Sequence, residues 1–357
     1  MKNLYLHIGA HKTGTTAIQK FLSMNRDNLK KKGYLYPGIH DAHHFIPEKI
    51  LMGNQLHDDS KNHIEQLFKE IQSSDLKNII ISSENFENLK EKVPELKNLL
   101  KNKFDCKIIY YVRRQDERLE SLYRGNVKNP TNRLQDTLAE YYTKFDTVSD
   151  YYSLLSPWRE AFGEKNIFVR VYEKGQLPHG IYQDFLTIIG LEWDNNLNIP
   201  TNQINRGLGW DLTEIIRLCN IQFPNDPNLH QFLVRNLSKV QINEKEKNYY
   251  GLSPQQRRNI VKHYDKSNVK VAREYLGRED GRLFYAPLPD PNEPWEPYEG
   301  LTIEEIVPIF TQMLYNMDLK YQKKFRKLHR HTISGKNYGF GKYLSGIRLR
   351  IIQILKR

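Results

Sequence analysis

HIGAHKTGTT, residues 7–16, combines two glycines five residues apart with one lysine and three threonines. The common nucleotide-binding loop reads G-x-x-x-x-G-K-[ST]. Gly9 and Gly14 keep that spacing, and Thr16 fills the last position. Thr15 stands where the lysine is expected, and the lysine comes earlier, at Lys12. The loop is therefore either a degraded NTPase loop or a loop built for a different phosphate ester.

The sequence around the loop predicts a strand before it and a helix after it. LYLHI (4–8) is a short apolar strand, and TAIQKFLSMN (16–25) carries apolar residues at helical spacing. A strand-to-helix turn presents backbone N–H groups and the positive end of a helix dipole to an anion. The two glycines allow the backbone to curl closely around phosphate oxygens. This context favours an anion site over a simple tight turn.

Three further apolar runs, separated by amphipathic helices, define the fold class. They are NIIIS (78–82), CKIIYYV (106–112) and IFVRVY (167–172). The alternation predicts an α/β, P-loop-like three-layer core, in which helices flank a central, mostly parallel sheet. From about residue 205 the chain is expected to be largely helical, with a proline-rich irregular connector at 284–300.

The expected organisation is one catalytic domain with a tail. We expect residues 1–200 to form the α/β core, residues 201–330 to be a helical part that completes it, and residues 331–357 to be a basic amphipathic tail. The stretch KYLSGIRLRIIQILKR (342–357) fits either an ordinary surface helix or a helix that lies on an anionic membrane face.

Composition narrows the possible partners and the compartment. The 357 residues carry a formal net charge of +12, which favours anionic partners. The sequence lacks zinc-finger and RNA-binding signatures, so nucleic acid is not the expected partner. Cys106 and Cys219 are expected to be buried free thiols. With neither a signal peptide nor an apolar run of membrane-spanning length, we expect a cytoplasmic protein, with the inner membrane surface as the second option.

A second anion site is predicted at the end of the 106–112 strand. In VRRQDERLESLY (112–123), Arg113 sits at the strand exit, and Arg118 and Ser121 share one face of the following helix. An arginine fork with a hydroxyl at this mouth of the sheet suits a phosphate. The alternative is a solvated helix start whose glutamates pair with the arginines. Neither the 78–82 strand nor the 106–112 strand is followed by an aspartate for a metal, so a ligand with two separated phosphates is expected.

These two motifs resemble those of the PAPS-dependent sulfotransferases, where PAPS is 3′-phosphoadenosine 5′-phosphosulfate. AHKTGTT (10–16) is similar to the family's P-K-[ST]-G-T-T loop, and Arg113 and Ser121 have the spacing of its 3′-phosphate motif. Segments 205–220 and 267–285 resemble the bacterial, carbohydrate-type branch. The resemblance implies metal-free transfer of a sulfuryl group from PAPS to an acceptor hydroxyl on a carbohydrate, such as a polysaccharide or glycolipid.

The resemblance also implies roles for single residues. Lys12 would stabilise the leaving group at its bridging oxygen. Residues Thr13, Gly14, Thr15 and Thr16 would hold the 5′-phosphosulfate, and Arg113 and Ser121 would hold the 3′-phosphate.

The general base is expected at the end of the 78–82 strand. Glu84 is the leading candidate, and the alternatives are His11 and the histidines His40, His43 and His44. In the HDAHH cluster (40–44), His43 and His44 are expected to contact the acceptor. A metal site is not expected there, because adjacent histidines do not readily ligate one ion.

Two other functions remain open on the sequence. One is a P-loop kinase that uses ATP and Mg²⁺, which would show metal-dependent nucleotide binding. The other is a non-catalytic protein that binds anionic glycans through its positive charge.

Overall fold

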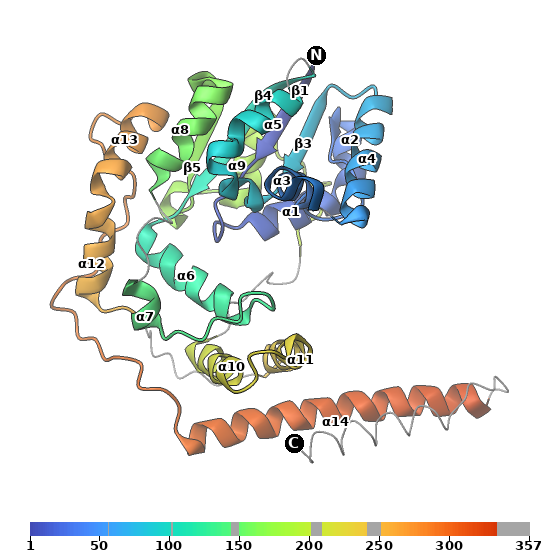
Figure 1. The fold of residues 1–357 in the computed structure, drawn as a ribbon, viewed down its shortest axis with the longest axis vertical. Coiled ribbons are helices and arrows are strands. Elements are labelled where there is room, and N and C mark those ends of the chain that lie inside the picture. The colour runs from blue at the N-terminus through green and yellow to red at the C-terminus, as the bar shows by residue number, and fades with distance from the viewer. Residues whose placement is uncertain (56, 101–102, 144–149, 201–208, 241–250, 334–357) are drawn as a thin grey trace.

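A five-stranded parallel sheet forms the centre of the part of the chain that the structure describes (Figure 1). The computed structural model describes residues 1–357 except 56, 101–102, 144–149, 201–208, 241–250 and 334–357. The strand order is β2-β3-β1-β4-β5. The strands are β1 Lys2–His7, β2 Tyr34–Leu35, β3 Asn78–Ser82, β4 Phe104–Val112 and β5 Ile167–Val171. The predicted parallel sheet is confirmed, and β2 is an edge strand that the sequence did not indicate.

The central strand β1 shows why apolar residues follow one another in the middle of these strands. Its Leu4 pairs with Ile79 of β3 and with Cys106 of β4. Leu4 and Ile79 face one hydrophobic cluster, whereas the next residues along each strand, Tyr5 and Ile80, face another. Because both faces of the sheet are covered, the strands carry no polar alternation.

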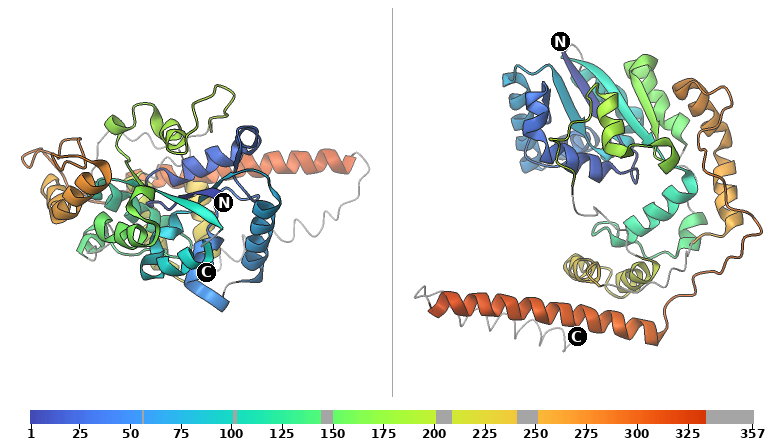
Figure 2. Two further views of the ribbon diagram at one scale, coloured as in Figure 1. Left: turned by 90° about the horizontal axis from the view of Figure 1, so that it is seen from above. Right: turned by 180° about the vertical axis from the view of Figure 1, so that it is seen from behind.

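Helices cover the two faces of the sheet in separate layers (Figures 1 and 2). One layer contains α1 Thr15–Met24, α2 Arg26–Lys31 and α9 Gly180–Ile188. The other contains α3 Phe45–Met52, α4 Asp58–Ser73, α5 Val93–Leu100, α8 Tyr151–Phe162 and α13 Asp265–Leu276. Short 3-10 helices lie between them: η1 Gly53–Gln55, η2 Glu84–Lys92, η3 Glu164–Asn166 and η4 Lys174–Gln176. The predicted three-layer core is therefore present.

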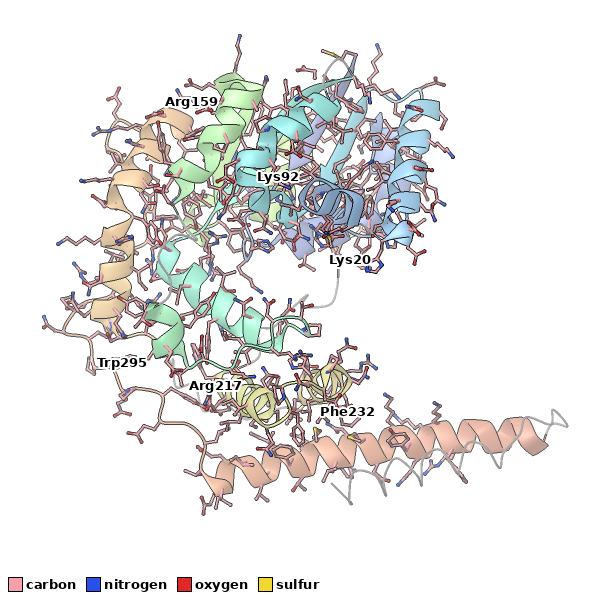
Figure 3. The ribbon with its side chains drawn as sticks, in the orientation of Figure 1. Lys20, Lys92, Arg159, Arg217, Phe232 and Trp295 are labelled. Carbon is pink, nitrogen blue, oxygen red and sulfur yellow. The ribbon has the colours of Figure 1, made fainter. Side chains whose placement is uncertain are left out.

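A second hydrophobic core joins the helical half to the sheet through α6 (Gln115–Lys128). Leu119, Tyr123 and Val127 of α6 are buried at a spacing of four residues, on one side of the helix. They pack with the remaining helices, which are α7 Leu138–Thr143, α10 Trp210–Gln222, α11 Pro227–Leu237, α12 Pro254–His263 and α14 Ile303–Ile333. The side chains of α10 and α11 fill the space between α6 and α14 (Figure 3). The largely helical C-terminal half is thus confirmed.

Two predictions concern the C-terminal end of the chain: the boundary at residues 330–331 and the basic tail. Helix α14 continues to Ile333, so the predicted boundary between residues 330 and 331 falls inside a helix. Residues 334–357, which carry most of the predicted basic tail, lie outside the described residues. No helix of the described chain is both long and apolar enough to cross a membrane.

Candidate active site

The loop after β1 contains two glycines with positive φ angles. Gly9 has φ +121° and Gly14 has φ +82°. A Cβ on Gly14 would lie 2.7 Å from Cδ1 of Ile181, so the close packing also requires glycine there. The loop remains paired with β4, because Ala10 N donates to Tyr111 O at 3.0 Å and Tyr111 N donates to Gly9 O at 2.8 Å. The sheet therefore fixes the loop at the carboxyl end of β1.

The end of this loop and the first turn of α1 form the strand-to-helix turn at which the sequence predicts an anion cradle. Thr15 and Thr16 open the helix, where backbone N–H groups have no intrahelical acceptor. Thr15 is buried and Thr16 is exposed. The hydroxyl of Thr13 donates to Ala10 O at 2.7 Å, so this side chain closes the loop on itself. Thr13 can contribute to an anion only through its backbone N–H.

Lys12 reaches from this loop to the middle of α6. A Cβ placed on Gly125 would lie 2.3 Å from Lys12 Nζ, so the ammonium group rests directly on the glycine. Burial lowers the pKa of Lys12, and the positive charges of Lys128, Arg124 and Arg113 lower it further, against the opposing charge of Glu84. The only lysine of the loop thus lies where several cations converge on one face of α6.

That face of α6 carries a row of polar and cationic side chains. Ser121, Arg124 and Lys128 follow at intervals of three and four residues, which places them on one side of the helix. The guanidinium of Arg124 lies 5.3 Å from the centre of the Trp210 ring. Burial lowers the pKa of Lys128, and the charge of Arg124 adds to that effect. Arg124 and Lys128 were not predicted, although their spacing from Ser121 and Gly125 was a usable signal.

Arg113 connects this row to the loop. Its Nη1 donates to Lys12 O at 3.1 Å, and its Nε pairs with Glu117 Oε2 at 3.2 Å. The guanidinium lies 5.8 Å from the centre of the Tyr172 ring. Next to Arg113, a cavity of about 500 Å³ opens between α6 and residues 287–290, and Arg124 also lines it. Arg113 and Arg124 therefore border one opening, whose lining carries both signs of charge: Arg113, Arg114, Arg124 and Arg257 together with Glu117, Glu120, Asp290 and Glu293.

Arg118 does not belong to the predicted arginine fork. Its side chain is 1% exposed and donates to Glu87 Oε1 at 2.5 Å and to His11 O at 3.2 Å. The fork prediction failed here because α6 is rotated so that Arg118 points into the core beside Tyr151. Arg118 therefore has a structural role: its side chain holds the loop after β1 through the backbone carbonyl of His11.

Glu87, in η2, is the loop's main support, and the sequence did not single it out. Its carboxylate is buried and accepts from His11 N at 2.9 Å, from Tyr110 Oη at 3.0 Å and from Arg118. These contacts fasten the loop after β1 to β4 and α6. Glu87 lies three residues after Glu84, so both carboxylates come from the same short helix but serve different purposes.

Glu84 lies just after the carboxyl end of β3, near His44 and His11, which the sequence also gave as site candidates. Its Oε2 accepts from Gln19 Nε2 of α1 at 2.7 Å. Burial alone would raise the pKa of Glu84, but the charge of nearby His44, the hydrogen bond from Gln19 and the charge of His11 lower it on balance. The carboxylate is therefore ionised at neutral pH and can accept a proton.

The two other candidate histidines near Glu84 differ from each other in availability. Burial lowers the pKa of His11, so its ring is neutral at pH 7. His44 is half-buried, and its Nδ1 lies 2.7 Å from Ser83 Oγ. That contact leaves Nε2 of His44 as the ring nitrogen facing away from the bond to Ser83. His44 is thus the histidine of the pair 43–44 that can present a nitrogen to an acceptor.

His43 has both ring nitrogens engaged inside the protein. Its Nδ1 accepts from Ser82 N at 3.1 Å, and its Nε2 donates to Pro37 O at 2.9 Å. Burial lowers its pKa to about 4, so the ring stays neutral. The structure therefore places His43 as a fastening between the loop at 37–44 and β3, rather than at an open surface.

His40, the remaining histidine of HDAHH, has a neighbour that was not apparent in the sequence. Its Nε2 lies 3.3 Å from His63 Nε2 of α4. In the described chain, no group of three or more His, Cys, Asp or Glu side chains is arranged to hold a metal ion. Cys106 and Cys219 are free, the first buried and the second half-buried.

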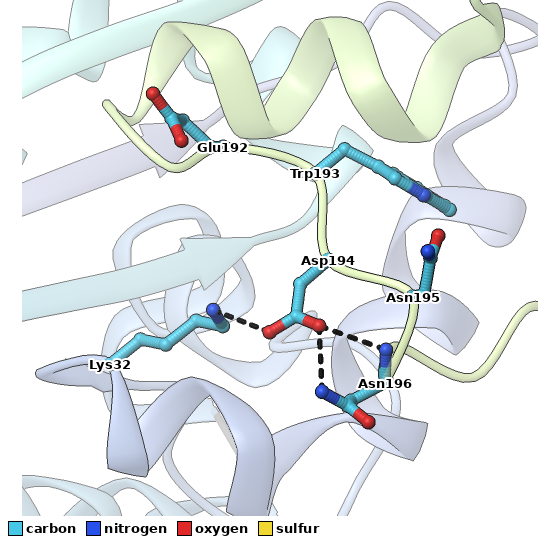
Figure 4. Close-up of a pocket in the computed structure, with 6 residues that line it drawn as sticks. All are labelled: Lys32, Glu192, Trp193, Asp194, Asn195 and Asn196. Carbon is cyan, nitrogen blue, oxygen red and sulfur yellow. Dashed lines mark hydrogen bonds and ion pairs between the residues drawn. The ribbon is translucent and has the colours of Figure 1, made fainter.

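A separate shallow pocket lies near the amino end of the edge strand β2 (Figure 4). Lys32, which precedes β2, pairs there with Asp194 at 2.7 Å, and Asp194 also accepts from Asn196 N and Nδ2 at 2.9 Å. Because it is at the amino end of β2, this pocket does not belong to the site formed by Lys12, Glu84 and α6.

The candidate site is contained in one recognised region of the chain. Residues 5–177 match the family model of the sulfotransferase domain. The sulfotransferase-domain match begins in β1 and ends just after β5, so it includes Lys12, Glu84, Arg113 and Ser121. Helices α9 to α14 lie beyond it.

Similar proteins come from several organisms. An uncharacterized protein of Archaeoglobus fulgidus is 31% identical over 206 residues, which are 57% of this chain and 55% of the relative, so the chain spans about half of that relative's length. A sulfotransferase from Alicyclobacillus acidocaldarius has a TM-score of 0.39 at 17% identity, over 66% of this chain and 96% of that one. The sulfotransferase domain from the curacin biosynthetic pathway has a TM-score of 0.38 at 13% identity, over 73% and 97%. Mouse sulfotransferase SULT7A1 complexed with PAP has a TM-score of 0.33 at 15% identity, over 66% and 88%.

Proposed function

We propose that this protein is a sulfotransferase that moves a sulfuryl group from PAPS to an acceptor hydroxyl, and that this hydroxyl belongs to a carbohydrate. The observation that carries the proposal is the position of Lys12. Its side chain extends from the loop, next to the proposed anion cradle at residues 13–16. Its ammonium contacts Gly125 of α6, near the charged side chains of Arg124 and Lys128. We expect a lysine at that point to lie between the proposed 5′-phosphosulfate site and the proposed 3′-phosphate site.

The described residues fit a donor with two separated phosphates. Backbone N–H groups at the start of α1 suit the 5′-phosphosulfate, since a helix N-terminus stabilises an anion. Arg113 and Ser121, with Arg124 and Lys128 added from the structure, suit the 3′-phosphate through charge-assisted hydrogen bonds. When bound, PAPS supplies the activated sulfuryl group, and the chain's residues bind, orient and move the proton.

Lys12 would act on the leaving group. As the bond between sulfur and the bridging oxygen breaks, its electron pair passes to the 5′-phosphate of the departing nucleotide. An ammonium held next to that oxygen stabilises the charge that develops there. Burial and the neighbouring positive charges lower the pKa of Lys12.

Glu84 would take the proton of the acceptor. As the acceptor oxygen forms its bond to sulfur, the hydroxyl proton passes to the Glu84 carboxylate, which Gln19 orients through a 2.7 Å hydrogen bond. His44, whose charge acts on Glu84, would hold the acceptor from the other side. His11 belongs to the loop itself and is half-buried, and its backbone N–H donates to Glu87, so we assign it a positioning role rather than direct proton transfer.

The carbohydrate acceptor and the membrane contact rest on the sequence. The resemblance to the bacterial branch supports a sugar hydroxyl, and His44, the one histidine of the pair 43–44 with an available ring nitrogen, lies close enough to Glu84 to lower the pKa of that carboxyl. The basic segment 342–357 supports contact with an anionic membrane face, where polysaccharide and glycolipid acceptors are assembled.

The proposal is tested by thermal shift with adenosine 3′,5′-bisphosphate, with and without EDTA. We expect stabilisation that EDTA does not reduce, and weaker stabilisation by 5′-AMP, which lacks the second phosphate. Stabilisation by ATP only in the presence of Mg²⁺ would show a kinase instead. Lys12→Ala should remove sulfuryl transfer while the fold persists, whereas Lys30→Ala, on the exposed side of α2, should leave transfer unchanged.

A further inference from the structure

Glu173 lies just after β5, at the same edge of the parallel sheet as the loop of Lys12, but it has no part in the proposed reaction. Its Oε2 accepts from Tyr285 N at 3.0 Å, and its Oε1 accepts from Ala286 N at 2.9 Å. The side chain of Gln176 donates to the same Oε2 at 2.6 Å. One carboxylate therefore holds two consecutive backbone N–H groups from a distant part of the chain.

Those N–H groups belong to the 283–290 segment, which includes the start of the proline-rich connector. Residues 285–289 have only three backbone N–H groups, because positions 287 and 289 are proline. Glu173 accepts from two of these three. An irregular segment has no ladder of backbone hydrogen bonds, so side chains such as Glu173 have to supply its partners.

Two arginines hold the carbonyl groups of the same segment. Arg114 Nη1 donates to Pro287 O at 3.0 Å, and Arg258 Nη1 donates to Pro289 O at 3.0 Å. Arg114 is itself fixed, since its Nε and Nη2 donate to the buried carboxylate of Asp116 at 2.8 and 3.0 Å. The segment therefore runs from the end of β5 past the start of α6 to α12, on the way from α13 to α14 (Figure 1).

This course makes the segment one wall of the cavity beside Arg113. Residues 287–290 line the cavity of about 500 Å³ on one side, and α6 lines it on the other. Arg113 and Arg124, which border the same cavity, are the arginines proposed to bind the 3′-phosphate. A nucleotide held by them would lie against the 283–290 segment.

We infer that Glu173 is a positioning residue for the donor nucleotide, because it holds the 283–290 segment in place as a wall of the nucleotide cavity. The inference rests on the proposed function, since it takes Arg113 and Arg124 as the residues that bind the 3′-phosphate. Glu173 lies inside the sulfotransferase-domain match at 5–177, whereas the segment lies beyond it. The carboxylate thus joins the matched domain to the part of the chain that follows it.

Glu173→Gln should weaken this wall without removing a side chain of similar size. Glutamine replaces one carboxylate oxygen by an NH₂ group, which cannot accept a hydrogen bond from a backbone N–H. A site that is complete for only a fraction of the time binds its ligand more weakly by that fraction. If the segment is in place for about a tenth of the time in the variant, the Kd of the nucleotide rises about tenfold.

The inference is tested by titration calorimetry of the full chain with adenosine 3′,5′-bisphosphate. We expect Glu173→Gln to bind it about tenfold more weakly than the wild type. In a sulfuryl-transfer assay, the KM for PAPS should rise about tenfold while kcat stays within about twofold, because Glu173 acts on binding and not on the transfer step.

Asp150→Asn is the matched control. The Asp150 carboxylate accepts from Ser153 N at 3.0 Å and from Ser267 Oγ at 2.7 Å, so it also fastens backbone and a distant segment, but it does not line the cavity. This variant should keep the wild-type nucleotide affinity. Equal losses of affinity in the two variants would overturn the inference, as would an unchanged affinity in Glu173→Gln or a fall in kcat at unchanged KM. A wild-type chain that does not bind the bisphosphate would end the proposed function as well.

Amide hydrogen exchange follows the segment directly. In the wild type, adenosine 3′,5′-bisphosphate should slow exchange in peptides that cover 283–290. In free Glu173→Gln the same peptides should exchange faster than in the wild type, while exchange in β1 and β4 should stay the same and so show that the fold persists. A segment whose exchange is unaffected by the nucleotide in the wild type would contradict its role as a wall of the cavity.

Discussion

The ammonium group of Lys12 fills the space that a side chain at position 125 would need. A Cβ on Gly125 would lie 2.3 Å from Nζ and 2.6 Å from Cε of Lys12. Gly125 is inside α6, where glycine destabilises a helix by about 1 kcal/mol relative to alanine. The helix thus contains an unfavourable residue at the one point where the loop lysine crosses it.

Gly125→Ala should separate stability from activity. We expect the free energy of unfolding to change little or to rise by up to about 1 kcal/mol, because the flexible end of Lys12 can move aside. Turnover should fall about a hundredfold, since a displacement of about 1 Å at a reacting group has that effect. Urea unfolding and a sulfuryl-transfer assay give the two quantities.

A double-mutant cycle shows whether Gly125 acts through Lys12. Adding Gly125→Ala to Lys12→Ala should cause no further loss of turnover, because the lysine has already been removed. Gly175→Ala, where a Cβ would meet no atom within 4 Å, is the matched control and should keep full turnover. Additive losses in the double variant would contradict a role through Lys12.

Glu84→Gln should lower kcat by about a hundredfold or more, because glutamine cannot accept the acceptor's proton. The pH profile provides a second measurement. A base acts while it is deprotonated, and the pKa of Glu84 lies below its usual 4.5. Activity of the wild type should therefore stay level from neutral pH down to about pH 5. A fall in kcat/KM already below about pH 6.5 would instead indicate a histidine base.

Glu87→Gln should destabilise the protein by about 3–5 kcal/mol, because it leaves the buried guanidinium of Arg118 without its carboxylate. Urea unfolding measures this loss, and Glu87→Gln/Arg118→Met should recover part of it. Arg159→Met, which breaks half-exposed pairs with Glu164 and Glu274, should cost less than about 1 kcal/mol. Equal losses for the two single variants would show that the Glu87–Arg118 pair is not special.

Arg113→Met and Arg124→Met should each weaken binding of adenosine 3′,5′-bisphosphate by about tenfold to a hundredfold, as expected for a lost charged hydrogen bond. Binding of 5′-AMP should change far less, since it lacks the 3′-phosphate. Titration calorimetry measures both affinities. Arg235→Met, on the exposed side of α11, removes the same charge and should leave both affinities unchanged. A similar loss for both nucleotides would place the two arginines elsewhere.

Local sequence was enough to predict the core of the fold. The runs 78–82 and 106–112 are apolar because their strands are covered on both faces, and that property is visible in the sequence itself. The strand–loop–helix order around Lys12 is equally local. Strand β2 was missed because two residues, Tyr34 and Leu35, are too few to show a period.

The site could be predicted only in part, because the rotation of α6 is set by distant contacts. Spacing put Arg118 on the same face of the helix as Ser121, but it could not show that Arg118 would point toward Glu87 and Tyr151. In the same way, the proximity of Lys12 to Gly125 depends on where α6 leaves β4. Glu87 resembled any exposed helix-start glutamate until the fold brought His11 and Tyr110 to it.

Helix α6 belongs to two cooperative systems at once. One side packs Leu119, Tyr123 and Val127 into the second core, and another carries Ser121 and Arg124, which we propose to bind the 3′-phosphate. If the helical half moved away from the sheet, α6 would carry Arg124 and Lys128 away from Lys12. A nucleotide bound at the sheet is therefore expected to stabilise the packing of the helical half against it. Amide hydrogen exchange in α10 and α11 should slow when a nucleotide binds at the sheet, although neither helix supplies a residue to the predicted nucleotide site.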